Sequence, residues 1–142
     1  MNLLSPHGTH RDRSGWVVVL QAGAAYFACV FAVGFMLGPI RENWVIPRLG
    51  RVPAHLLESV VMLTVSVLFA RWVLRRFAVT RRKGTRVAIG VVAFVLLQIA
   101  EGALALWLLG QGPQQYVLSL WSAPGAITIL VQMVFGAIPA FI

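Results

Sequence analysis

The chain is short of charged residues. They make up 11% of its 142 residues, whereas a soluble globular domain carries roughly 25%. Hydrophobic residues, in contrast, make up 59%. So few charges do not suffice to build a water-facing surface around a chain of this length. The composition therefore excludes an ordinary soluble domain and favours a single domain that lies in a membrane.

Cysteine, histidine and acidic residues are also scarce. The one cysteine, Cys29, cannot form an internal disulfide, which excludes the membrane thiol enzymes that need cysteine pairs. His7, His10 and His55 all lie outside the middle of the apolar segments, so a haem held between two helix histidines is not expected. The sequence has no Gly-rich phosphate loop, no Ser/His/Asp set and no cluster of metal ligands. We therefore expect no metal, no cofactor and no enzymatic activity.

Long apolar segments dominate the chain. A helix needs about 20 apolar residues to cross the hydrocarbon core of a bilayer. Lipid offers no partner for backbone N–H and C=O groups, so each crossing segment must be helical. The sequence predicts an all-α fold, with a mobile tail over residues 1–15 and one transmembrane four-helix bundle over residues 16–142. The expected helices span residues 16–38, 54–76, 87–110 and 123–141. An alternative has three crossings, with the fourth segment lying on the membrane surface.

Basic residues gather between the second and third segments. The stretch from Arg71 to Arg86 carries seven positive charges and no acid. Because Lys- and Arg-rich flanks stay in the cytoplasm, this link and both termini are predicted to be cytoplasmic, in a cell inner (plasma) membrane. We expect lipid-headgroup contacts here from Arg75, Arg76, Arg81, Arg82, Lys83 and Arg86.

The net charge of +8 has two interpretations. A basic chain is typical of nucleic-acid binding. In this sequence, however, most basic residues flank apolar segments, where the orientation rule accounts for them. We therefore expect the lipid bilayer, other membrane subunits or a second copy of the chain as partners, and no nucleic acid.

The segment from Gly38 to Pro53 is unusual for an outer loop. It carries three prolines and three arginines, together with apolar residues such as Trp44 that favour the headgroup layer. Pro53 suits the first turn of the next helix, where its missing N–H costs nothing. Arg41, Arg48 and Arg51 have two interpretations. They pair with Glu42, Glu58 and lipid phosphates, or they form a collar that binds an anion or a partner.

Two acids lie at membrane depth, Glu58 and Glu101. Glu58 is near the outer end of its helix, where it forms a structural pair with an outer arginine or a site for a cation or proton. Glu101 lies roughly 22 Å from the cytoplasmic end of its helix, and an acid at this depth is a functional candidate. Three states are open for Glu101: a neutral acid, an acid facing Glu58 or the arginines, and an acid facing a wet cavity. Its candidate hydrogen-bond partners are Gln98, which shares its helix face, Thr128 and Gln132.

Small residues and helix-end signals complete the local pattern. Gly34 and Gly38 form a small-xxx-small step that lets another helix approach closely. Ser122, followed by Pro124, is typical of a capped helix start. Pro139 is predicted to kink or end the last helix.

The chain resembles a group of small uncharacterised bacterial inner-membrane proteins. The resemblance implies a four-helix fold and brings no activity. The residues that carry it are Gly38-Pro39-Ile40-Arg41, Pro47-Arg48-Leu49-Gly50, Glu58, Ala70-Arg71-Trp72 and Glu101.

Two classes of function remain. The first is an accessory or assembly subunit of a larger membrane complex, acting through helix–helix and outer-loop contacts. The second is a small oligomeric transporter or channel for an ion or solute. In the second class Glu101 and Glu58 act with the outer-loop arginines.

Overall fold

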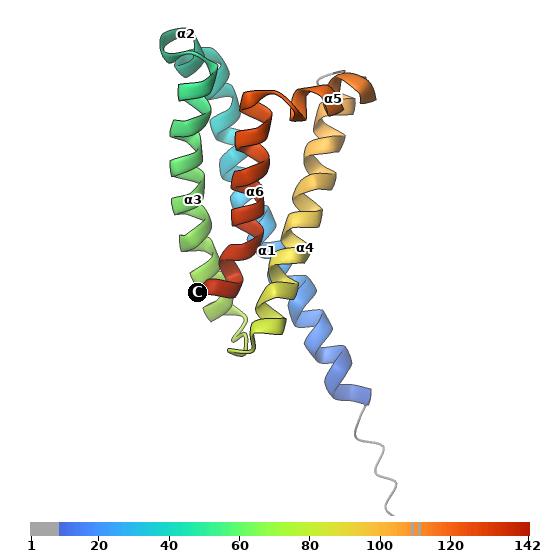
Figure 1. Ribbon diagram of the computed structural model, residues 1–142. Coiled ribbons are helices and arrows are strands. Elements are labelled where there is room, and N and C mark those ends of the chain that lie inside the picture. Colours follow the sequence, from blue (N-terminus) through green and yellow to red (C-terminus); the bar gives the residue numbers. More distant parts are fainter. Residues whose placement is uncertain (1–8, 109, 111) are drawn as a thin grey trace, which may run out of the picture.

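The computed structural model describes residues 9–108, 110 and 112–142 (Figure 1). Regular structure in these residues is entirely helical, which confirms the predicted all-α fold. The elements are α1 (Thr9–Ile40), η1 (Arg41–Val45), α2 (Ile46–Leu49), α3 (Arg51–Arg76), α4 (Lys83–Ala103), η2 (Leu104–Leu108), α5 (Pro113–Leu120) and α6 (Ala123–Phe141). The two η elements are wide, π-helical turns.

Four helical stretches are long and apolar enough to cross a membrane. They cover Gly15–Leu49, Arg51–Arg76, Lys83–Leu108 and Ala123–Phe141. The chain is therefore a multi-pass membrane protein built as a helical bundle. In this bundle α1 packs on α3 and α4, and α6 packs on the same two helices from the opposite side. Because α6 lies inside the bundle, the three-crossing alternative with a surface-lying last segment does not describe this fold.

The bundle has two different ends (Figure 1). At one end, here called the α2 end, η1 and α2 join α1 to α3, and α5 lies across the top between α4 and α6. The opposite end, here called the basic end, carries the loop 77–82, the start of α1 and the last turn of α6. These two ends divide the molecule into halves that differ in packing.

The close-packed core lies in the half toward the basic end. Its buried apolar residues are Val19, Ala22, Tyr26, Val30, Ala70, Val73, Leu74, Ile89, Ala93, Leu97, Phe135 and Ile138. In the other half, the buried apolar side chains are the small Ala54 and Ala105. Among the described residues, the half toward the α2 end therefore has fewer fully buried apolar side chains.

Tyr26 ties the centre of the core together. It reaches from α1 across the bundle to α6, where its ring stacks on Phe135 with centroids 4.5 Å apart. Its hydroxyl donates to the backbone carbonyl oxygen of Phe135 at 2.9 Å. That carbonyl has no helical partner, because the residue four positions later is Pro139, which lacks an N–H. Tyr26 thus satisfies a buried acceptor that the proline leaves free.

The closest contacts between helices occur at glycines, but mainly at glycines other than the predicted Gly34 and Gly38. A Cβ built on Gly90 of α4 would lie 1.9 Å from the carbonyl oxygen of Gly136 in α6, so these helices meet backbone to backbone. One built on Gly23 would lie 2.7 Å from Val92. Gly34 lies against Met62 of α3, as its predicted packing role requires, whereas a Cβ on Gly38 would meet nothing within 4 Å. The packing role predicted for Gly38 therefore has no partner among the described residues.

Several predicted boundaries differ from the structure. Helical structure continues from α1 through η1 and α2 to Leu49, so the predicted outer loop is mostly helical. Only Gly50, with φ 86°, breaks the helix before α3. Residues 9–15 belong to α1 and are not a tail, whereas residues 1–8 lie outside the described residues. The predicted link between the third and fourth expected helices contains a helix of its own, α5, which begins with Pro113 in its first turn.

The predicted start of the last helix is confirmed. Ser122 lies at the N-cap of α6, and its hydroxyl accepts a hydrogen bond from the Gly125 backbone N–H at 3.2 Å. Pro53 lies in the first turn of α3, as expected. Pro139 does not end α6 directly, since the helix runs on to Phe141.

Candidate functional site

A wide turn at the end of α1 positions Arg41. Pro47 has no N–H, and its ring crowds the carbonyl four residues earlier, which disfavours a regular α-helix here. The backbone instead widens over η1, where the Ile46 N–H donates to the Arg41 carbonyl. Asn43 adds a side-chain hydrogen bond to the Pro39 carbonyl at 2.9 Å. Arg41 therefore lies on an ordered helical turn that faces the first turns of α3.

Arg41 forms an ion pair with Glu58 of α3. A guanidinium nitrogen of Arg41 donates to the Glu58 carboxylate, and the other terminal nitrogen lies 3.3 Å from Glu42. The Arg41 and Glu58 side chains are 23% and 16% exposed, so the pair is only partly screened by solvent. The Arg41 Nε is buried and has no hydrogen-bond partner. Of the two interpretations of the arginines, pairing with Glu58 and Glu42 describes Arg41.

Glu101 lies in a chain of three polar side chains between α4 and α6. Gln98 Nε2 donates to Gln132 Oε1 at 2.6 Å, and Gln132 Nε2 donates to a Glu101 carboxyl oxygen at 2.5 Å. Gln132 is buried, whereas Gln98 and Glu101 are half-buried. Sequence spacing places Gln98 and Glu101 on one face of α4, so a single residue of α6 bridges both. Gln132 was one of the open partners for Glu101.

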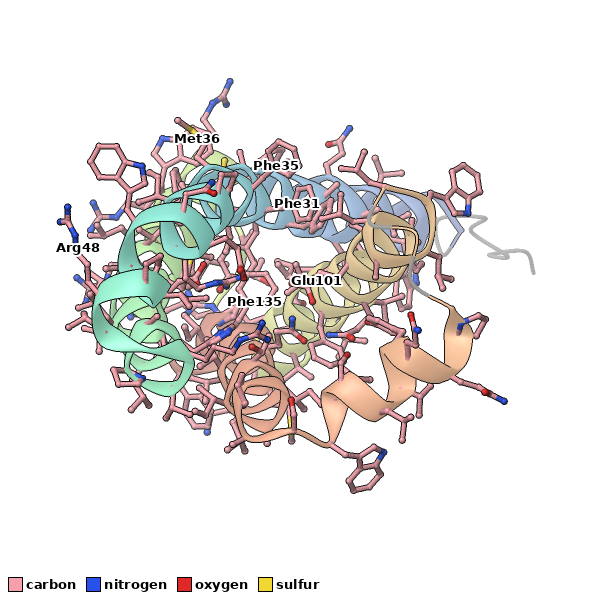
Figure 2. All side chains as sticks on the ribbon, turned by 90° about the horizontal axis from the view of Figure 1, so that it is seen from above. Phe31, Phe35, Met36, Arg48, Glu101 and Phe135 are labelled. Atoms are coloured by element: carbon pink, nitrogen blue, oxygen red, sulfur yellow. The ribbon has the colours of Figure 1, made fainter. Side chains whose placement is uncertain are left out.

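The two acid sites face the same interior. Figure 2, which looks onto the molecule from above, shows Glu101 inside the ring of helices. Glu101 lies within electrostatic range of both Glu58 and Arg41. Tyr116 of α5 is also nearby: burial, and then the charge of Glu101, raise the pKa of its phenol. Side chains from η1, α3, α4 and α6 therefore make up one polar cluster, which comprises Arg41, Glu58, Gln98, Glu101 and Gln132.

The other two outer-loop arginines do not join the polar cluster. Arg48 and Arg51 are exposed, and Figure 2 shows Arg48 on the outside of the bundle, pointing away from Glu101. They belong to a projecting segment, residues 41–51, here called the α2 cap. Trp44 and Leu49 in the α2 cap are 68% and 55% exposed. The sequence pattern grouped three arginines, and the fold separates Arg41 from Arg48 and Arg51.

Hydroxyl side chains in the membrane helices donate hydrogen bonds to backbone carbonyls of their own helices. Thr128, a candidate partner of Glu101, donates instead to the Pro124 carbonyl at 3.0 Å. Ser66 donates to the Met62 carbonyl and Thr64 to the Val60 carbonyl, each four residues earlier. These hydroxyls satisfy themselves locally. Thr128 is therefore not the partner of Glu101.

The predicted headgroup residues lie together at the basic end. Arg75 and Arg76 form the last turn of α3, Arg81 and Arg82 lie in the following link, and Lys83 and Arg86 begin α4. Within the residues that the structure describes, no group of three or more His, Cys, Asp or Glu side chains is arranged to hold a metal ion.

The sequence did not reveal that Tyr26 donates a hydrogen bond to the carbonyl that Pro139 leaves free. A proline inside an apolar helix signals a free carbonyl four residues earlier, so Pro139 pointed to Phe135. The spacing of residues along the sequence did not indicate that α1 would supply the hydrogen-bond donor for this carbonyl.

Comparisons with known proteins found no match to a family model, to a curated protein or to a solved structure. Function is therefore inferred from the geometry of the chain itself.

Proposed function

We propose that the chain is a non-enzymatic accessory or assembly subunit of a larger membrane complex. It would act through helix–helix contacts and through the exposed α2 cap. The observation that carries this proposal is that both acids at membrane depth are bonded within the chain, Glu58 to Arg41 and Glu101 to Gln132.

The bonding of the acids favours a structural use of both. The Arg41–Glu58 pair fastens the α2 cap to α3, and the Glu101–Gln132–Gln98 chain fastens α4 to α6. Both bonds lie in the half that has little buried apolar surface. The opposite half is closed by the core around Tyr26 and Phe135. A bundle of this kind is a scaffold, and its distinctive groups lie on its surface.

The α2 cap offers the kind of surface that recognises another protein. Arginine and tryptophan are enriched at the centres of protein–protein interfaces. Here exposed Trp44 and Leu49 lie beside the exposed charges of Arg48 and Arg51. The ion pair of Arg41 with Glu58 orders this segment before it binds, which lowers the entropic cost of association.

We further infer the orientation and membrane of the protein. The basic end carries the Lys- and Arg-rich link and is assigned to the cytoplasm. Both chain ends then lie in the cytoplasm, and the α2 cap lies on the outer side of a bacterial inner membrane. The resemblance to small bacterial inner-membrane proteins agrees with this assignment.

Affinity purification in a mild detergent tests the accessory role. We expect a discrete set of membrane proteins to co-purify with the wild-type chain and to be lost from the Arg48→Ala/Arg51→Ala variant. The matched control is Arg76→Ala/Arg82→Ala, which removes two exposed charges from the opposite end. Equal retention of partners by both double variants, or no co-purifying chain with the wild type, contradicts the proposal.

Transport is the second candidate function. It is favoured by one observation: Glu101 lies inside the ring of helices (Figure 2) and within electrostatic range of Glu58 and Arg41. In an oligomer, Glu101 would bind a proton or a small cation that enters from the α2 end. In this function Glu101 and Glu58 bind the transported ion, in addition to the contacts that they make between helices.

Proteoliposome flux assays separate the two functions. If the protein transports protons or Na⁺, Glu101→Gln abolishes flux while the protein still assembles, because an amide keeps a hydrogen bond to Gln132 but cannot ionise. Glu42→Gln is the control, since it removes an exposed carboxylate. Wild-type flux equal to that of protein-free liposomes rules out transport of the ions tested.

A further inference from the structure

The basic end contains a cavity that the predicted headgroup contacts do not explain in full. Its volume is about 730 Å³, and it lies where the end of α3, the start of α4 and the last turn of α6 meet. Five cationic side chains line it: Arg71, Arg75, Arg81, Lys83 and Arg86. Arg76 and Arg82, which are adjacent in sequence to Arg75, Arg81 and Lys83, are not among its lining residues. The basic cluster is therefore divided into residues that face the cavity and residues that do not.

The cavity charges are not neutralised within the described part of the chain. No acidic side chain lines the cavity, and the salt bridges among the described residues involve only Arg41, at the other end. The Nε of Arg86 is buried without a hydrogen-bond partner.

We propose that this cavity binds an anionic ligand that carries two phosphate groups. Arginine side chains pair with phosphate oxygens through two parallel N–H bonds, and basic pockets between transmembrane helices bind such headgroups. One phosphate group pairs with one or two arginines, so a ligand with two phosphates engages more of the five cationic side chains than a ligand with one. Leu74 and Phe141 give the same cavity an apolar wall, which suits the acyl part of a lipid. The inference does not depend on the α2 cap.

Binding measurements with two probes identify the source of the phosphates. The lipid probe is cardiolipin, which carries two phosphates, titrated into phosphatidylcholine nanodiscs that hold the full-length protein. Phosphatidylglycerol is its single-phosphate comparison, and the soluble probe is inorganic pyrophosphate. Binding of cardiolipin that pyrophosphate does not displace supports the site and identifies a lipid ligand. Displacement by pyrophosphate supports the site and identifies a soluble ligand. Equal affinity for cardiolipin and phosphatidylglycerol overturns the two-phosphate assignment.

A pair of matched variants tests whether the cavity itself is the site. Arg75→Gln/Arg81→Gln removes two lining charges, and Arg76→Gln/Arg82→Gln removes the two neighbouring charges, with all four side chains exposed. We expect the first variant to bind the favoured probe about 30-fold more weakly and the second to lose less than about fivefold. Equal losses in the two variants would overturn the proposal, because they would show diffuse attraction to the whole basic end.

Discussion

At the scale of single residues, two polar contacts join different helices of this bundle. The Phe135 carbonyl, freed by Pro139, accepts from Tyr26, and Glu58 accepts from Arg41. Neither backbone nor side-chain polar groups find a substitute partner in lipid, so each pair stabilises the fold by avoiding an unsatisfied group. Proline at position 139 is therefore tolerated because a tyrosine from another helix replaces the missing hydrogen bond.

Removal of the Tyr26 hydroxyl tests this pairing. Tyr26→Phe keeps the stacked ring and leaves the Phe135 carbonyl unsatisfied, which is expected to cost about 1–3 kcal/mol of unfolding free energy. In a Pro139→Ala background the backbone N–H returns, and the same change is expected to cost about 1 kcal/mol less. Unfolding by SDS of the purified protein measures both values. An identical cost in the two backgrounds contradicts the exchange of partners.

At the scale of helices, the sequence predicted the elements better than their contacts. Lengths of apolar segments are sufficient to predict four crossing helices, because the bilayer sets the length. Residues 38–53 were predicted as an outer loop between two apolar helices, yet Pro47 is accommodated by the wide turn η1 and the helix continues to Leu49. Close packing was predicted at both Gly34 and Gly38, and only Gly34 lies against a neighbouring helix. Which glycines face a neighbour depends on how each helix is rotated within the bundle.

The contact between α4 and α6 gives the clearest test at this scale. Gly90→Ala is expected to destabilise the bundle by about 1–3 kcal/mol, because its Cβ would lie 1.9 Å from the Gly136 carbonyl oxygen and the backbones would have to separate. Gly102→Ala in the same helix meets nothing within 4 Å, and is expected to be neutral or to stabilise by up to about 1 kcal/mol. SDS unfolding compares the two variants. A larger loss for Gly102→Ala would show that α4 does not pack as described.

At the scale of the whole molecule, the two halves of the bundle do different work. The half toward the basic end carries the packed core, and the half toward the α2 end carries the polar cluster. The acids were evident in the sequence as unusual groups at membrane depth, and the arginines as unusual groups in an outer loop. Their partners were not, because pairing of Arg41 with Glu58 and of Glu101 with Gln132 depends on how four helices are arranged around one another.

Thiol labelling of intact cells tests the proposed orientation. With Cys29 replaced by alanine, a cysteine at Gln114 in α5 is expected to react with a membrane-impermeant maleimide. A cysteine at Thr80, in the basic link, is expected to react only after the membrane is permeabilised. Both positions are exposed in the structure, so accessibility within the protein does not bias the comparison. The reverse pattern would place the basic end outside the cell.

The most direct test of the account is photo-crosslinking from the α2 cap in living cells. A photoreactive p-benzoylphenylalanine replacing Leu49 is compared with one replacing Leu68 on the outer surface of α3; the native side chains are 55% and 61% exposed. We expect a discrete protein adduct from position 49 and none from position 68. No adduct from position 49, or the same adducts from both positions, would contradict the claim that the α2 cap is the surface through which this subunit binds its partner.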